Sequence, residues 1–283
     1  MISEAAQCAS RFPGGFTVLM SVYGGDDPAL FDAALGSLKA NTLQPDHMVL
    51  VIDGPISQGL EDIVQRWQPV LGFCVVRLPR NVGLANALNA GLKEVRTEWI
   101  ARADADDFNL PGRFECQARL AASGAGDVIG GAIMEVNRDG AALTCRILPS
   151  RHEDILRFAR RRNPVNHMTV VMRASLVRQM GGYPEIPGRR DYGLWAKMLA
   201  SGARMVNTEE VLVRATAGRD LMRRRGGLRY ARAEIALQRY LVRCGLKGKV
   251  QAVIDGLSRA FIFALPIFLR SWIYRNFLRS NTL

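Results

Sequence analysis

Histidine, paired cysteines and long apolar runs are scarce in this sequence of 283 residues. The three histidines and five widely spaced cysteines, with no C-x-x-C pair, exclude a structural zinc site and favour a reduced compartment. The first fifteen residues contain Glu4 and no apolar run, so we expect no secretory signal. An apolar run at 260–269 contains Pro266 and falls well short of the roughly 20 residues that cross a bilayer. These absences predict a cytoplasmic protein.

The composition is that of a globular protein whose charge is unevenly distributed. Hydrophobic residues make up 48% of the chain, enough to bury a core. Residues 1–213 are electrically neutral, whereas residues 214–283 carry the whole net charge of +12, and arginine supplies most of it. Arginine favours bidentate contacts with phosphate, although a solvated helical surface would also explain such a tail. We expect an N-terminal arm at 1–14, a catalytic domain at 15–216 and a basic helical extension at 217–283.

Short apolar runs alternate with helical spacing through the first hundred residues, which predicts an α/β fold with a mostly parallel sheet. The predicted strands are 16–23, 47–53, 73–78 and 98–103, and the predicted helices are 28–40, 60–67 and 82–95. Beyond Gly126 the order is less regular. There we expect extended segments at 127–136, 143–148, 168–172 and 204–213, with helices at 153–161, 174–180 and 192–200.

Aspartates gather where two of the predicted strands end. Asp104, Asp106 and Asp107 follow the fourth strand, and Asp53 ends the second. The carboxyl ends of strands are where open α/β sheets bind their ligands, so we expect these carboxylates to share one crevice. Such a cluster suits Mg²⁺ or Mn²⁺ together with substrate phosphate oxygens. A solvated acidic turn, or an Asx-turn at Asp53, is the structural alternative.

Three further polar positions in the sequence are candidates for a site. Asn86 lies one turn before Asn89 in a helix otherwise made of Ala and Leu, where asparagine costs stability unless it has a partner. Asp191 starts a helix that presents Trp195, so it is either a general base with an aromatic rim or a carboxylate favoured by the helix dipole. His167 is either a hydrogen-bonded core residue or a part of the site.

Several short motifs together resemble glycosyltransferase family 2, in particular the bacterial enzymes of exopolysaccharide, capsule and O-antigen synthesis. The resemblance covers nearly all of residues 16–216. Each motif is weak alone, but their order and spacing together are specific. The motifs are SVYGGD, VLVIDGP, RNVGLANALNAG, WIARADADD, NPVNHMTVVMR, GGYP and RDYGLWAKMLASG. It implies a GT-A fold, a nucleotide-sugar donor, a divalent metal (Mn²⁺ or Mg²⁺) and inversion at the anomeric carbon.

The resemblance also implies roles for individual residues. It makes Asp191 the catalytic base and Asp106, assisted by Asp107, the metal ligand. The implied donor-binding residues, for a UDP-sugar, are Tyr23, Asp53, Asn81, Asn86, Arg102 and Asp104. Two positions depart from the family pattern: Ile52 precedes Asp53, which weakens the uridine assignment, and Arg190 replaces the usual Glu before the base. A neighbouring arginine favours the ionised carboxylate and lowers its basicity.

The basic tail suggests contact with a membrane or with a lipid-linked substrate. Aromatic and arginine residues alternate from Arg259 to Arg279, which predicts an interfacial helix among anionic headgroups, with a core-packing helix as the alternative. The resemblance implies an acceptor saccharide linked to polyprenyl diphosphate, and hence peripheral association with the inner face of the cell membrane. The implied acceptor or diphosphate contacts are His167, Trp195, Arg223, Arg224 and Arg225.

Two other functions are compatible with parts of the sequence. A haloacid-dehalogenase-like phosphohydrolase also uses Asp-x-Asp after a strand, but there the motif normally belongs to the first strand, whereas here it ends the fourth. A nucleic-acid-binding protein would fit the pI of about 10.1. We expect no nucleic-acid partner, because the charge is confined to an aromatic tail beside a neutral domain.

Overall fold

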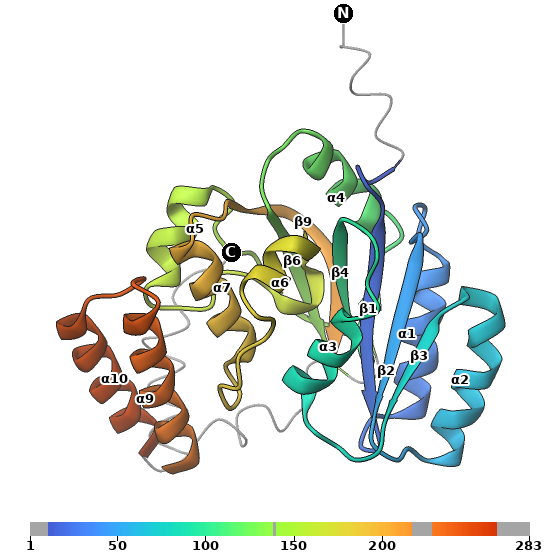
Figure 1. The fold of residues 1–283 in the computed structure, drawn as a ribbon, viewed down its shortest axis with the longest axis horizontal. Helices are drawn as coiled ribbons and strands as arrows, with labels where there is room; N and C mark the ends of the chain where they lie inside the picture. Colours follow the sequence, from blue (N-terminus) through green and yellow to red (C-terminus); the bar gives the residue numbers. More distant parts are fainter. Residues whose placement is uncertain (1–10, 138–139, 217–227, 265–283) are drawn as a thin grey trace, which may run out of the picture.

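The structure, a computed structural model, describes residues 11–137, 140–216 and 228–264. In Figure 1 the first part of the chain, coloured blue to cyan, lies to the right and the last helices, coloured orange to red, lie to the left. The elements of the first half are β1 (Phe16–Tyr23), α1 (Pro28–Lys39), β2 (His47–Asp53), α2 (Gln58–Leu71), β3 (Cys74–Leu78), α3 (Leu84–Leu92), β4 (Trp99–Asp104), β5 (Phe108–Asn109) and α4 (Arg113–Ala122). The predicted alternation of strands and helices is confirmed.

The second half completes the sheet and adds helices to it. Its elements are β6 (Val128–Val136), β7 (Ala142–Arg146), α5 (His152–Ala159), the 3-10 helix η2 (His167–Thr169), β8 (Val171–Arg173), α6 (Ala174–Gln179), α7 (Arg190–Ala200) and β9 (Met205–Thr216). The extended segment expected at 168–172 was partly wrong, because the chain first makes the 3-10 turn of η2. β5 was not predicted, since two residues are too short for a periodicity signal.

The described strands form one nine-stranded sheet in the order β3-β2-β1-β4-β8-β6-β9-β5, with β7 beside β6. β1 to β4 pair in parallel, whereas β8 is antiparallel to both β4 and β6. In the parallel register Tyr23 lies opposite Asp53 and Ser21 opposite Asp104. The strand-end aspartates therefore meet at one edge of the sheet, as predicted.

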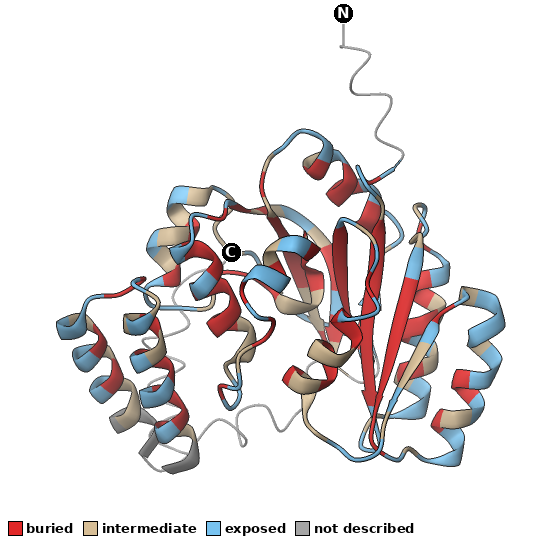
Figure 2. Ribbon diagram, viewed as in Figure 1, coloured by how far each residue is buried: buried red, intermediate tan, exposed pale blue. Residues whose placement is uncertain are grey.

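The sheet is buried between two apolar layers (Figure 2). Val18 and Met20 of β1 pack into the layer that contains α1, α2 and α4, and Leu19 between them packs toward α3 and α7. Gly91 of α3 lies directly on the sheet, because a Cβ there would come within 2.6 Å of the side chains of Leu19 and Val51. This close packing fixes α3, and the loop before it, against the strands that carry the aspartates.

The last described elements are two helices, α9 (Leu228–Arg243) and α10 (Lys249–Ala264), which pack on each other and which we call the hairpin. α9 packs on α7, on the side away from β1 to β3 (Figure 1). Its fully buried Glu234 forms ion pairs with Arg189, just before α7, and with Arg259 of α10, both at 3.1 Å. No helix within the described ranges is both long enough and apolar enough to span a membrane.

Candidate functional site

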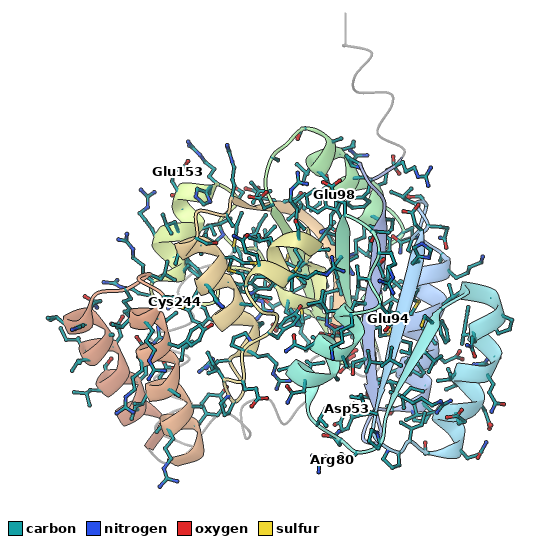
Figure 3. The ribbon with its side chains drawn as sticks, viewed as in Figure 1. Asp53, Arg80, Glu94, Glu98, Glu153 and Cys244 are labelled. Atoms are coloured by element: carbon teal, nitrogen blue, oxygen red, sulfur yellow. The ribbon has the colours of Figure 1, made fainter. Side chains whose placement is uncertain are left out.

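A cavity of about 360 Å³ opens where β1, β2 and β4 end. It is lined by Ser21, Tyr23, Asp26, Asp53, Asn81, Gly83, Leu84, Arg102, Asp104, Ala105, Asp106 and Arg190. Six of the predicted site residues are therefore brought to one cavity from separate parts of the chain. Figure 3 shows Asp53 near Arg80, at the end of β2.

Asp53 is held by the loop that follows β3. Its carboxylate is 3% exposed and accepts hydrogen bonds from the backbone N–H groups of Val82, at 2.7 Å, and Gly83, at 3.0 Å. Asn81 donates from its side chain to the Asp53 carbonyl at 3.3 Å. Asp53 thus fixes the chain just before α3 as well as lining the cavity, a structural role that the sequence analysis did not predict.

Asp26 is a cavity residue that the sequence analysis missed. It accepts a hydrogen bond from the backbone N–H of Tyr23 at 3.0 Å, and Tyr23 itself is 46% exposed. Burial, and then repulsion from Asp106 and Asp104, raises the pKa of Asp26 to about 6 against the effect of that hydrogen bond. The signal was present in the sequence, because Asp26 lies just after the first strand and Asp53 ends the second.

Asp104 lies above a buried layer of arginine. Arg102, 1% exposed, forms an ion pair with Asp104 and donates to the carbonyl of Leu19 at 3.2 Å. The wholly buried Arg113 in turn donates to the carbonyl of Arg102 at 2.7 Å. Burial lowers the pKa of Arg113 to about 9, while Asp104 opposes that shift. Positive charge beneath the cavity thus partly balances the carboxylates around it.

Asp106 and Asp107 have different surroundings in the structure. Asp106 lines the cavity, and burial followed by the charge of Asp104 raises its pKa. Asp107 is 4% exposed and is not among the lining residues; its carboxylate accepts from the backbone N–H of Thr216 at 2.9 Å. Burial, Asp104 and Asp106 raise its pKa well above the usual range. Asp107 therefore anchors the end of β9, which argues against its expected part in metal binding.

The carboxylates fit a divalent cation that also binds substrate. Within the described ranges no group of three or more His, Cys, Asp or Glu side chains could hold a metal ion. Asp104 and Asp106 nevertheless share the cavity, and their mutual repulsion contributes to the raised pKa of Asp106. Mg²⁺ and Mn²⁺ sites need only one or two carboxylates when phosphate oxygens and water complete the coordination. The donor set fits such an ion.

Asp191 lies in the first turn of α7, next to the cavity residue Arg190. Its carboxylate accepts a hydrogen bond from the side chain of Asn163 at 2.6 Å and stays partly exposed. Asp191 and Asp104 both act electrostatically on His167, so both carboxylates lie within electrostatic reach of this histidine. Asn163 was not singled out in the sequence, where nothing connects it with a residue 28 positions away.

His167 and Trp195 form a compact aromatic cluster with Tyr183. His167 Nε2 lies 3.1 Å from the Tyr183 hydroxyl, and the His167 ring is 6.1 Å from that of Trp195. Burial, followed by the charge of Arg102, lowers the pKa of His167 to about 4. Trp195, for which we expect an acceptor contact, is 0% exposed and packs beside the His167 ring.

The two asparagines of α3 have different partners. Asn86, expected to bind the donor, lies outside the lining and donates to the carbonyl of Val82, just before its own helix, at 3.3 Å. Asn89 donates to the carbonyl of Tyr183 at 2.9 Å and accepts from the Tyr183 N–H at 2.8 Å. Asn89 therefore joins α3 to the loop before α7. The expected contacts of Arg223, Arg224 and Arg225 lie outside the described residues.

Solved structures share this fold. The crystal structure of S. aureus TarS residues 1–349 in complex with UDP-GlcNAc matches it with a TM-score of 0.66 at 18% identity, over 94% of this chain and 76% of that chain. At this level of identity the match concerns the fold alone. The architecture is the GT-A fold that the sequence predicted.

Sequence comparisons identify the family. Amylovoran biosynthesis glycosyltransferase AmsE of Erwinia amylovora is 35% identical over 262 residues, which are 92% of this chain and 98% of that protein. The UDP-Gal:alpha-D-GlcNAc-diphosphoundecaprenol beta-1,3-galactosyltransferase of Escherichia coli is 32% identical over 266 residues, 93% of this chain and 96% of that protein. The model of glycosyl transferase family 2 matches residues 17–179. The chain belongs to glycosyltransferase family 2.

Proposed function

We propose that this protein is an inverting glycosyltransferase that moves a hexose from a UDP-sugar to a polyprenyl-diphosphate-linked saccharide in bacterial surface polysaccharide synthesis. The observation that carries the proposal is the single cavity shared by Asp53, Asp104, Asp106 and Arg190, with Asp191 beside it. The name of the Escherichia coli relative supports both a UDP-sugar donor and a diphosphate-linked acceptor. The phosphohydrolase alternative has no remaining support, because the chain belongs to a transferase family.

The donor would occupy the strand-end wall of the cavity. Asp53 and the exposed ring of Tyr23 would contact the nucleotide base, and Asp104 would face the ribose or the sugar. Asp106, with Asp104 beside it, would hold Mn²⁺ or Mg²⁺. When bound, such an ion supplies positive charge that stabilises the departing diphosphate. The buried Arg102 orients Asp104 through their ion pair.

The acceptor would approach from the side of α7. Asp191 takes the proton from the acceptor hydroxyl, the acceptor oxygen forms a bond to the anomeric carbon, and the bond from that carbon to the diphosphate breaks. Displacement on the face opposite the leaving group inverts the anomeric configuration. Asn163 holds one carboxylate oxygen of Asp191, and the other remains available for the acceptor. His167 completes this side of the site as a neutral hydrogen-bonding group, since its pKa is about 4.

The domain limits proposed from the sequence follow the same division. Residues 15–216 would form the transferase domain, whose last strand is β9. Residues 217–283 would form the basic extension, which includes the hairpin. Arg223, Arg224 and Arg225 would meet a diphosphate, because guanidinium groups bind phosphate oxygens in a bidentate way. The enzyme would work at the inner face of the cell membrane, where its lipid-linked acceptor is embedded.

A donor screen tests the proposal directly. We expect UDP-sugars, but not GDP-sugars, to raise the thermal unfolding midpoint of the full chain, and to do so more strongly with Mn²⁺ than with a chelator. Asp106→Asn should remove the effect of Mn²⁺ while leaving the midpoint without ligand nearly unchanged. Glu153→Gln, on the distant helix α5, is the matched control. Equal responses to UDP- and GDP-sugars, or no effect of Mn²⁺ in the unmodified protein, would contradict the proposal.

A further inference from the structure

One face of α10 exposes a row of aliphatic side chains to solvent. Val250, Val253, Ile254 and Leu257 are 75%, 58%, 55% and 64% exposed, and we call them the α10 stripe. Their spacing of three and four residues places all four along one side of the helix. Isolated exposed aliphatics are ordinary in soluble proteins, but a continuous row on one helix face marks an interaction surface.

The core of the hairpin does not need this row. α10 packs inward through Ala252, and α9 through Leu237 and Leu241, which are at most 6% exposed. The polar contacts of the hairpin also point inward. Lys247, which is 5% exposed, donates to Gln238 at 2.8 Å and pairs with Asp255 at 2.5 Å. The α10 stripe therefore remains outside a hairpin that is already packed and hydrogen-bonded.

Exposed charge on the described part of the hairpin is entirely positive. Its exposed ionic side chains, which we call the basic row, are Arg232, Arg239, Arg243 and Lys249. The three arginines share one side of α9, again at helical spacing. The only two acidic residues between 228 and 264, Glu234 and Asp255, are committed to ion pairs with Arg189, Arg259 and Lys247. An exposed aliphatic stripe on one helix of a hairpin whose exposed charge is positive complements a hydrocarbon layer beneath anionic headgroups.

Both the charge and the following sequence favour a membrane as the occupant. A second copy of the hairpin would bring like charges together, and a stripe of four side chains is small for a stable dimer. Residues 265–283 add three arginines, four aromatic residues and no acidic residue. Arginine and aromatic side chains are enriched at membrane interfaces. The chain after α10 thus continues the chemistry of the exposed face.

We propose that the exposed side of α10 docks on an anionic lipid bilayer, with the α10 stripe entering the boundary between headgroups and acyl chains and the positive charge of the hairpin, the basic row included, adding electrostatic attraction to the headgroups. The ion pairs of Glu234 connect this face to Arg189, two residues before Asp191. In Figure 1 the end of α10 lies toward the same edge of the molecule as the ends of β1 and β2. Docking would therefore hold the acceptor side of the cavity near the membrane in which a lipid-linked acceptor resides.

Vesicle flotation of the full chain measures this docking. On phosphatidylcholine vesicles that contain phosphatidylglycerol, we expect Val253→Ser/Leu257→Ser to reduce the bound fraction by about tenfold or more, because two aliphatic side chains no longer enter the bilayer. Arg239→Gln/Arg243→Gln should lower it by about fivefold for each arginine, and only when phosphatidylglycerol is present. The matched controls, Val70→Ser on α2 and Lys39→Gln on α1, should bind like the unmodified protein.

A second measurement reports the depth of the stripe. Leu257→Trp should lose fluorescence on vesicles of brominated lipid relative to the unmodified protein, whereas Val70→Trp should not. Flotation of Val253→Ser/Leu257→Ser equal to that of the unmodified protein would overturn the proposal. So would a dimer in sedimentation that this variant dissociates, because the stripe would then bind a second copy. The inference rests on the proposed function only in explaining why docking would be useful to the enzyme. Vesicle binding is measured without donor or acceptor, so docking can fail while the proposed transfer reaction holds, and the reverse.

Discussion

The two sides of the cavity are built in different ways. The side to which we assign the donor consists of strand ends whose positions follow from the parallel register of β1, β2 and β4. The side to which we assign the acceptor depends on side chains that connect distant segments: Asn163 to Asp191, Asn89 to Tyr183, and Glu234 to Arg189. Backbone register tolerates many substitutions, whereas each of these contacts depends on one side chain. We therefore expect single substitutions to lower activity or stability more on the acceptor side than on the donor side, and to do so at only a few positions.

The largest effect should come from the proposed base. Asp191→Asn should lower kcat by about 10³, because an amide cannot accept the proton of the acceptor hydroxyl. Binding of UDP, measured by calorimetry, should change little, since the nucleotide lies on the donor side. Asp154→Asn on α5 is the control. If the Asp191→Asn variant still transferred sugar at the normal rate, Asp191 would not be the base. The assignment of the acceptor to this side of the cavity would then lose its main support.

The next effect tests the attachment of the hairpin. Glu234→Gln should lower the free energy of unfolding by about 3 kcal/mol, because it leaves Arg189 and Arg259 close together without their shared carboxylate. Chemical denaturation measures the change. Glu115→Gln, which breaks an exposed pair with Arg119, should cost at most about 0.5 kcal/mol. Similar losses from both variants would show that the buried ion pairs do not hold the hairpin.

A smaller effect is expected where the two sides of the cavity meet. Asn89→Ala should cost about 2 kcal/mol, because the N–H and carbonyl of Tyr183 both lose their partner. The nearby Asn86→Ala removes only one bond, to the carbonyl of Val82 just before the helix, and alanine favours the helix, so the free energy of unfolding should hardly change. Unfolding monitored by circular dichroism would compare the two, and equal costs would contradict a special role for Asn89.

The smallest effect concerns the charge of His167. Its folded pKa, about 4, is below its usual value near 6.5, so protonation favours the unfolded chain and stability is lost as pH falls through this window. Between pH 8 and pH 5.5 this residue should contribute a loss of about 1 kcal/mol. His167→Gln should remove that part of the pH dependence in denaturation experiments. An unchanged slope would show that His167 is not held neutral.

The sequence predicted the donor side better than the acceptor side, for a physical reason. Runs such as 16–23 and 47–53 carry their own strand and turn signals, so Asp53 and Asp104 could be placed at one edge before the structure was known. The burial of Asp107 could not be predicted from the sequence, because its partner, Thr216, is more than 100 residues away. The burial of Trp195 could not be predicted either, because helical spacing indicates which residues share a face but not what covers that face.

The double hydrogen bond between Asn89 and Tyr183 also has a practical consequence for exchanging parts between related enzymes. Gly182, with a φ of +79°, brings its backbone so close that a Cβ there would be 2.3 Å from the Asn89 side chain. A recombinant that takes α3 from one parent and the loop at 182–183 from another would have to match both partners. Chimeras intended to change donor preference should therefore inherit these two segments together.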